Sequence, residues 1–262
     1  MVSEGIVAAI GGTQLLVKLL GPSFEYLGNE LKEWNEKRLN NLKSIFQKTE
    51  KIIDFSDEEG KRVSPRVLKE IINEGSVHES DIAQEYFAGI LASARTTNER
   101  DDRAAIVLKF ISQLTTYQII GHYITYHAVR KVYMGEDYSF TRRMHRDKMR
   151  VFIHWNDFSE MLGLNDQENP EILIPHIFFG LRKYELIEDF SYGNEKGVRI
   201  SPKGKKLSGI IIIPSAIGAE LFLSVYNKSD LRTRDILSEK HEFKEIESIN
   251  LNKEFQKATK VK

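Results

Sequence analysis

The chain has 262 residues, of which 41% are hydrophobic and 29% are charged, enough apolar material for one large globular domain or two modest ones. Lysine plus arginine equals aspartate plus glutamate, 38 of each, so no net charge draws the whole molecule onto nucleic acid or an anionic membrane. The absence of cysteine excludes disulfides, cysteine-ligated zinc, iron–sulfur clusters and thiol catalysis.

Residues 1–22 form an apolar amino-terminal segment, in which residues 5–17 carry no charge. The run is shorter than the roughly 20 apolar residues of a bilayer crossing, and Gly11-Gly12 disfavours a helix there. It lacks the basic flank and the cleavage site of a secretory signal, which predicts a cytoplasmic protein. Two alternatives stay open: a short helix docked on the domain or on a second copy, and an interfacial helix peripheral to the inner membrane.

Residues 24–53 carry apolar side chains at steps of three and four, which predicts a long amphipathic helix after the break at Gly21-Pro22. A helix of this length packs across several others or pairs with a second subunit. Its first part is the candidate oligomer or partner face, formed by Phe24, Leu27, Leu31 and Trp34.

Further helix starts are marked by local capping patterns: Ser64-Pro65, Ser76-x-x-Glu79 and Thr115-x-x-Gln118. They predict a short helix closed by Gly75, a helix ending near residue 94, and a helix from 115 to about 134, with another over 104–114. No strand pattern precedes residue 150. Residues 23–150 are therefore expected to form an all-helical domain.

The pattern changes after residue 150. Helices are predicted over 157–164 and 171–186, extended chain over 189–200 with a turn at 192–194, a helical turn at Ser201-Pro202, and strand-like chain over 209–213. Two helices followed by a hairpin outline a winged helix-turn-helix over 151–226. The polar residues 227–262 are expected to form a docked helix or a tail. The predicted fold is mainly α, with a helical amino-terminal domain followed by a winged-helix-like carboxy-terminal domain that holds a small β-hairpin.

The sequence contains no recognisable catalytic, cofactor-binding or metal-ligating set of residues. None of the seven histidines has the helical spacing of a metal pair, and His122 and His127, five residues apart, point about 140° apart on a helix. Core or surface histidines are the prediction. A phosphate-binding glycine loop and a serine nucleophile elbow are missing from the sequence. We therefore expect no cofactor and no enzymatic activity, with an enzyme built from scattered polar residues as a remaining alternative.

Two basic clusters are candidate contacts for anionic partners. The proposed wing and the turn after it suit nucleic-acid or phosphate contact through Lys196, Arg199, Lys203, Lys205 and Lys206. The segment between the predicted domains is either a solvated linker or a contact for RNA or anionic lipid through Arg142, Arg143, Arg146, Lys148 and Arg150.

The helix over 171–186 argues against DNA reading. It begins with an acid and continues with apolar residues, where a recognition helix normally contacts bases. The stretch over 157–171 holds five acids and no lysine or arginine. A wing used for protein contact or dimer packing is the alternative.

Four stretches and a looser tail carry a family resemblance: Gly21-Pro22-x-x-Glu25-x-x-Gly28; LKSIFQKTEKI; VSPRVLKEIINEGSVHESDIAQEYFAGILASA; VLKFISQLTTYQIIGHYI; and, more loosely, GLRKYELIED, RISPKG and SAIGAELFLSVY. Together they resemble the Abi-alpha (abortive infection alpha) proteins of bacteria, over residues 15–135. Phe87 stands where the family commonly has tryptophan. The resemblance implies defence against phage, in which an infected cell stops growing or dies, and it implies no catalytic residues.

The expected function is therefore a non-enzymatic sensor or effector of abortive infection that acts through protein assembly. Its partners would be a second copy or a defence protein, and a phage-derived trigger. In this hypothesis the trigger shifts the assembly and releases the apolar amino-terminal segment onto the inner membrane. The alternative from another class is a winged-helix nucleic-acid-binding regulator that uses the basic wing.

Overall fold

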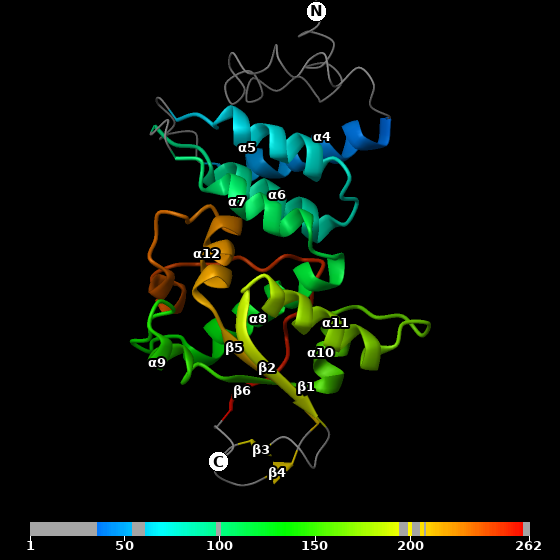
Figure 1. Cartoon of the computed structure of the whole chain (residues 1–262), viewed down its shortest axis with the longest axis vertical. Helices are drawn as coiled ribbons and strands as arrows, with labels where there is room; N and C mark the ends of the chain where they lie inside the picture. The colour runs from blue at the N-terminus through cyan, green and yellow to red at the C-terminus, as the bar shows by residue number, and fades with distance from the viewer. Residues whose placement is uncertain are drawn as a thin grey trace, which may run out of the picture. The chain divides into compact units, whose positions relative to one another are not determined.

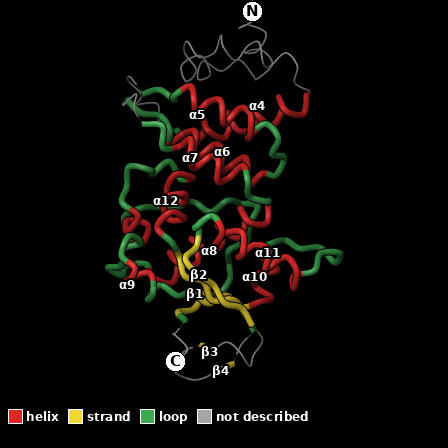
Figure 2. The backbone as a smooth tube through the Cα atoms, in the orientation of Figure 1, coloured by secondary structure: helices red, strands yellow, loops and turns green. Residues whose placement is uncertain are grey.

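The fold of the computed structural model is mainly α with a small antiparallel sheet (Figures 1 and 2). The structure describes residues 36–53, 61–97, 101–193, 199–200, 205–206 and 208–258, with backbone only at 199, 200, 205 and 206. The segment 1–22 and the face formed by Phe24, Leu27, Leu31 and Trp34 lie outside these residues. Two compact units emerge from the contacts: 1–113 with 224–229, and 114–223 with 230–262.

The first unit is helical. It contains α4 (Glu36–Ile52), α5 (Pro65–Glu70), the π-helix η3 (Ile71–Gly75), α6 (Asp81–Ser93) and α7 (Ala104–Ser112). Helix α6 packs against α4 and α7 and buries most of its length, including Phe87 and Leu91. The amphipathic pattern is confirmed in α4, which buries Leu42, Ile45 and Phe46 against these neighbours.

The caps explain where the helices begin. Ser64 Oγ accepts a hydrogen bond from Val67 N at 3.3 Å, so the predicted start of α5 is confirmed. The expected box at Ser76 is wrong, because α6 begins at Asp81 with Ser80 as its N-cap. Ser76 Oγ instead donates to Asn73 O at 3.1 Å and accepts from Arg38 Nε at 3.1 Å. That hydroxyl closes η3 and contacts α4 rather than starting the next helix.

The second unit combines helices with the sheet. Its helices are α8 (Thr116–Tyr133), α9 (Arg143–Arg146), α10 (Trp155–Met161), α11 (Pro170–Lys183), the 3₁₀-helix η4 (Thr233–Leu237) and the first part of α12 (Ala216–Val225). Its strands are β1 (Val151–His154), β2 (Ile187–Gly193), β3 (Arg199–Ile200), β4 (Lys205–Lys206), β5 (Gly209–Pro214) and β6 (Phe255–Lys257). The capping box that starts α8 at Thr115 is confirmed, since both reciprocal hydrogen bonds form.

The four-stranded sheet has the order β2-β5-β1-β6, and every pair is antiparallel. Strand β5 lies at its centre and is buried along its whole length, with Ile212 opposite Val151 on one side and Phe190 on the other. The predicted strand over 209–213 is confirmed as β5, and the predicted extended segment over 189–200 is confirmed in part as β2. The turn expected at 192–194 is wrong at its first two positions, because Tyr192 and Gly193 pair with Ile210 and Gly209 in the sheet. Strands β1 and β6 had no counterpart in the sequence prediction.

The boundary between the units falls at residue 113, not at the predicted 150, because α8 packs against α11, β1, β5 and β6. Before residue 150 the described elements are helices apart from one bridge between Arg62 and Thr96. Residues 227–258 are neither an α-helix nor a detached tail. They contain η4 and β6, and Phe243 and Ile249 are buried.

Candidate functional site

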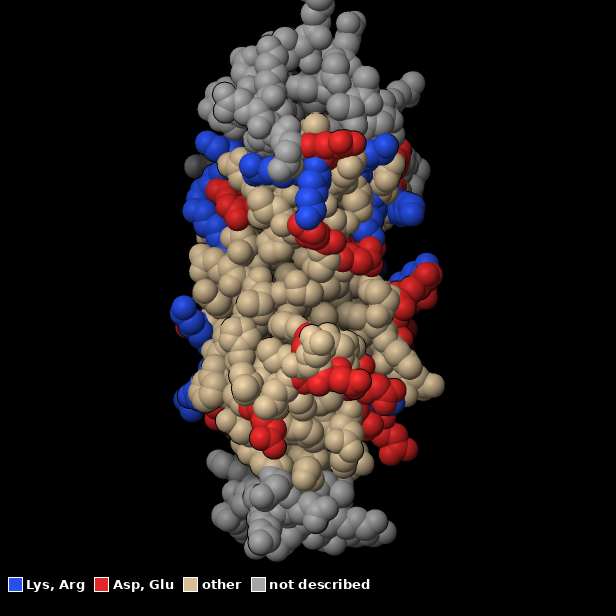
Figure 3. All heavy atoms as spheres, turned by 90° about the vertical axis from the view of Figure 1, so that its right-hand side faces the viewer, with Lys and Arg blue, Asp and Glu red and all other residues tan. Residues whose placement is uncertain are grey.

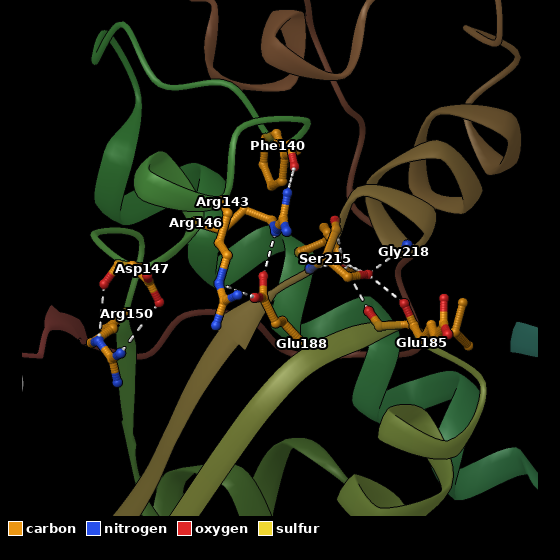
Figure 4. A network of polar contacts seen from close by, with 11 residues as sticks. Phe140, Arg143, Arg146, Asp147, Arg150, Glu185, Glu188, Ser215 and Gly218 are labelled. Atoms are coloured by element: carbon orange, nitrogen blue, oxygen red, sulfur yellow. Dashed lines mark hydrogen bonds and ion pairs between the residues drawn. The ribbon is translucent and has the colours of Figure 1, made fainter.

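The basic segment around α9 is partly internal. Arg146 Nη1 donates to Phe140 O at 2.7 Å, and its Nε donates to the Glu188 carboxylate on β2 (Figure 4). Arg143 Nε lies 3.8 Å from the other oxygen of Glu188, while its side chain is 81% exposed. Arg146 therefore holds α9 against the sheet and is not available as a contact for RNA or lipid.

Arg150 also has a structural role. Its Nε donates to Asp147 O at 2.9 Å, and Tyr133 Oη donates to the carbonyls of Lys148 and Arg150 at 2.9 and 2.7 Å. The backbone of this segment is thereby anchored to α8, so the prediction of a solvated linker is only partly correct. What remains at the surface we call the α9 surface: Arg142, Arg143, Met144 and Lys148.

Helices α10 and α11 and the loop between them present acidic and apolar side chains. Ile172 and Phe179 are seven residues apart on one face of α11, with exposed fractions of 66% and 58%. Acids lie along the same stretch, and Figure 3 shows acidic side chains across this side of the second unit, with lysine and arginine near its edges. We define the α11 surface by Asp166, Glu168, Glu171, Ile172 and Phe179.

Aromatic rings continue this surface onto β2. Phe179 meets Phe190 edge-on, with ring centroids 5.1 Å apart, and Phe190 stacks on Tyr192 at 5.9 Å. At the far end of the helix, Arg182 Nη1 lies 3.4 Å from the Asp189 carboxylate, so this cation already has an acidic neighbour. The charge on α11 therefore runs from acidic at its start to basic in its last turn, where Arg182 lies near Asp189 and Lys183 is exposed.

The proposed wing is described only through its backbone. Strands β3 and β4 pair with Arg199 opposite Lys206 and Ile200 opposite Lys205. Lys196, Lys203 and the helical turn expected at 201–202 lie outside the described residues. Pairing in this register brings two cationic positions, 199 and 206, directly across from each other.

The two histidines of α8 are core residues, which agrees with the sequence prediction of core or surface positions. His122 Nε2 lies 3.0 Å from Gly218 O, and burial lowers the pKa of His122 to about 4 against the opposing effect of that carbonyl. The His127 ring packs on Tyr123 and Phe222, with centroids 4.4 and 5.1 Å away. Burial, followed by the charge of Arg130, lowers the pKa of His127 to about 3, so both imidazoles are neutral near pH 7.

A buried polar network lies beside them that sequence reasoning missed. Tyr126 Oη donates to Leu186 O at 2.8 Å. Ser215 Oγ donates to Glu185 O at 2.5 Å and accepts from Gly218 N at 3.0 Å (Figure 4). Burial raises the pKa of Tyr126, which keeps its hydroxyl protonated as a donor. The network joins α8 to the turn after α11 and to the start of α12. The sequence does contain one signal for this network: Ser215 stands directly before an apolar run, which is typical of a helix N-cap.

Within the part of the chain that the structure describes, no group of three or more histidines and acids is placed to hold a metal ion. The same part contains no helix of the length and apolarity that a membrane crossing requires. Comparisons of the chain with family models, with curated proteins and with solved structures gave no match.

Proposed function

We propose that the chain is a non-enzymatic protein of abortive-infection-type phage defence that works by binding other protein surfaces. The defence role rests on the stretches that resemble the Abi-alpha proteins. The mode of action rests on one observation, the acidic and apolar α11 surface. That surface suits a protein partner because exposed apolar anchors with a polar rim are typical of protein interfaces.

We propose a winged-helix-like arrangement for the second unit. The order β1, α10, α11, β2, β5 places β1 and β2 on the two sides of β5, and the chain between β2 and β5 holds the β3–β4 pair. In such an arrangement α11 takes the place of the recognition helix, whose first residues contact base edges in DNA-binding proteins. Glu171 lies in that first turn and Asp166 just before it, so the DNA phosphates would repel this end of the helix.

The proposal of a role without catalysis is supported by the buried groups of α8. His122 and His127 are neutral core residues, and the Tyr126 hydroxyl is engaged by backbone carbonyls. A general acid or base must reach a substrate proton and titrate near the working pH. These three groups meet neither condition.

Assembly through residues 24–53, with the segment 1–22 moving to the inner membrane, completes the proposed mechanism. Its support is the amphipathic pattern of the sequence, since the described part of the helix begins only at Glu36. Flotation of the full chain with anionic liposomes, with and without phage lysate, tests the membrane step. Absence of the protein from the liposome fraction under both conditions would remove it.

The primary test is growth of bacteria that express the chain after phage is added at low and at high dose, against an empty-vector control. Abortive defence predicts protection at low dose and arrest or collapse of the culture at high dose. Equal lysis of both strains across a broad phage panel would contradict the defence role.

The second candidate function is a nucleic-acid-binding regulator. Its support is the register of β3 and β4, which sets Arg199 opposite Lys206 at the base of a predicted wing that also carries Lys203 and Lys205. A gel shift with duplex DNA and with RNA tests it: binding should weaken steeply with salt and on the double change Lys203→Glu plus Lys205→Glu. No shift at low salt would contradict this function.

A further inference from the structure

Two apolar side chains have the highest exposed fractions among the large hydrophobic residues that the structure describes. Met144 on α9 is 75% exposed and Ile172 on α11 is 66% exposed. Most of a side chain of this size is normally buried on folding, and apolar groups left at the surface inside a charged rim are common at protein contacts. Both belong to the second unit, so their relation can be described.

The charges around these two side chains have opposite signs. Met144 follows Arg142 and Arg143 and precedes Lys148, all exposed. Ile172 follows Glu171 and Asp166, also exposed, and no lysine or arginine lies between residues 157 and 171. The Met144 side has three exposed cations, Arg142, Arg143 and Lys148, and one exposed acid, Asp147, whereas the residues around Ile172 are acidic. The predominant charges of the two surfaces are therefore complementary.

The two surfaces lie on opposite sides of the second unit. In Figure 1, α9 stands at the left of the sheet and α10 and α11 at the right, and Figure 3 views the α11 side. One molecule cannot bring them together, whereas two molecules can. A contact between unlike surfaces is heterologous, and its repetition gives a ring or a filament.

We propose that the α9 surface of one copy docks on the α11 surface of a second copy, so that the chain assembles head to tail. The occupant is a second copy because this chain itself carries a partner of matching charge and apolar centre. Formal net charge is zero, with 38 cations and 38 anions, so copies approach without long-range repulsion. The inference specifies the assembly step of the proposed function and rests on that step alone. It does not depend on the defence role, because self-association can occur without any role in defence.

We expect the contact to be small and charged, because the two surfaces are defined by only four and five residues. Interfaces that bury less than about 1,200 Å² in total are typical of weak, transient complexes. We therefore expect self-association of the full chain between about 1 and about 100 µM, and a weaker association as salt rises from about 50 to about 500 mM.

Charge reversal on each surface tests the proposal by analytical ultracentrifugation. The acid-side variant is Asp166→Lys plus Glu171→Lys, and the basic-side variant is Arg142→Glu plus Lys148→Glu. Each alone should raise the dissociation constant at least tenfold, because the reversed rim meets a rim of its own sign. An equimolar mixture of the two should associate again, because the intact α9 surface of the acid-side variant meets the intact α11 surface of the other.

Matched controls carry the same change of charge elsewhere. Glu245→Lys plus Glu247→Lys controls for the acid-side variant, and Lys69→Glu plus Lys109→Glu controls for the basic-side variant; all four positions are exposed. Both controls should associate like the wild type, and thermal unfolding of every variant confirms that it is folded. Restored association in the mixture cannot come from two misfolded proteins.

A wild-type chain that stays monomeric at the highest concentration would overturn the proposal. So would single-side variants that associate as tightly as the wild type, since assembly would then use another face, such as residues 24–34. The same variants in the phage-growth assay keep the two proposals apart. A variant that stays monomeric but still protects contradicts a need for assembly in defence, not the docking itself.

Discussion

The buried histidines of α8 make the stability of the protein sensitive to mild acid. His122 is fully buried and His127 is 7% exposed, and burial lowers both pKa values from 6.5, to about 4 and about 3. The unfolded chain therefore takes up protons at a pH where the folded chain does not. Stability is complete above pH 6.5 and falls as the pH drops from there toward these folded-state values.

The size of the effect follows from the two pKa values. At about pH 5.5 an unfolded histidine with a pKa of 6.5 is mostly protonated, which stabilises the unfolded state by about 1.4 kcal/mol relative to about pH 8. The folded histidines stay neutral at this pH. Together the two residues should lower the free energy of unfolding by about 3 kcal/mol between these pH values.

Urea unfolding at about pH 8 and about pH 5.5 measures this difference. His122→Gln and His127→Gln should each be less stable than the wild type at both pH values, but each should lose about 1.4 kcal/mol less between them. Thr125→Val is the matched control: Thr125 is equally buried on α8, donates to Gly121 O at 2.7 Å and does not titrate. It should keep the full pH difference. Histidine variants with the same pH difference as the control would refute the reasoning.

Three further predictions concern packing and polar contacts. Gly89→Ala should lower the free energy of unfolding by at least about 2 kcal/mol, because the added Cβ would lie 1.8 Å from Val225 O; a Tm equal to wild type would contradict this. Thr115→Ala should cost about 1 kcal/mol in urea unfolding through loss of the α8 cap, and no change would mean that the capping box contributes nothing. A double-mutant cycle of Arg146→Met and Glu188→Gln should give a coupling of about 1–2 kcal/mol, since both side chains are less than one third exposed; additive effects would assign Arg146 mainly to its bond with Phe140 O.

Helix starts were predictable where the capping residues form their hydrogen bonds within the first turn of the helix. Ser64-Pro65 and Thr115-x-x-Gln118 fix their helix starts with bonds inside one turn, and both formed as expected. Ser76 had the same local pattern, yet its hydroxyl donates to Asn73 O and accepts from Arg38, which lies 38 positions away in the sequence. A capping motif is a local prediction, and a long-range donor such as an arginine can override it.

The sheet was predictable only in part, because burial on both sides removes the alternation that identifies a strand. Strand β1 consists of VFIH between β5 and β6, and its first three residues are all buried. So short an apolar run has no period by which to separate strand from helix. The prediction for residues 227–258 was wrong for the opposite reason. Their polar composition indicated a tail, but a few single contacts hold the segment in place. Among them, the Arg130 guanidinium donates to the carbonyls of Ser238 and His241.

The candidate site depends on how the basic residues divide between internal and external roles, which the sequence does not reveal. Of the five cations from 142 to 150, Arg146 and Arg150 stabilise the fold, while Arg142, Arg143 and Lys148 are exposed. A charge count over the segment therefore overstates what a partner meets. Exposure, rather than number, separates the α9 surface from the rest.

The same division between internal and exposed cations limits the salt dependence expected of nucleic-acid binding. The wing offers five cations, so its binding constant should fall with salt at a log–log slope no steeper than about −4.5 on duplex DNA. A steeper slope requires phosphate contacts beyond the wing, and the α11 surface, with acids at its start, does not provide them. If the α9 surface supplied them, it would be unavailable to a second copy. DNA should in that case dissociate the head-to-tail assembly, whereas DNA binding through the wing alone would leave the assembly intact.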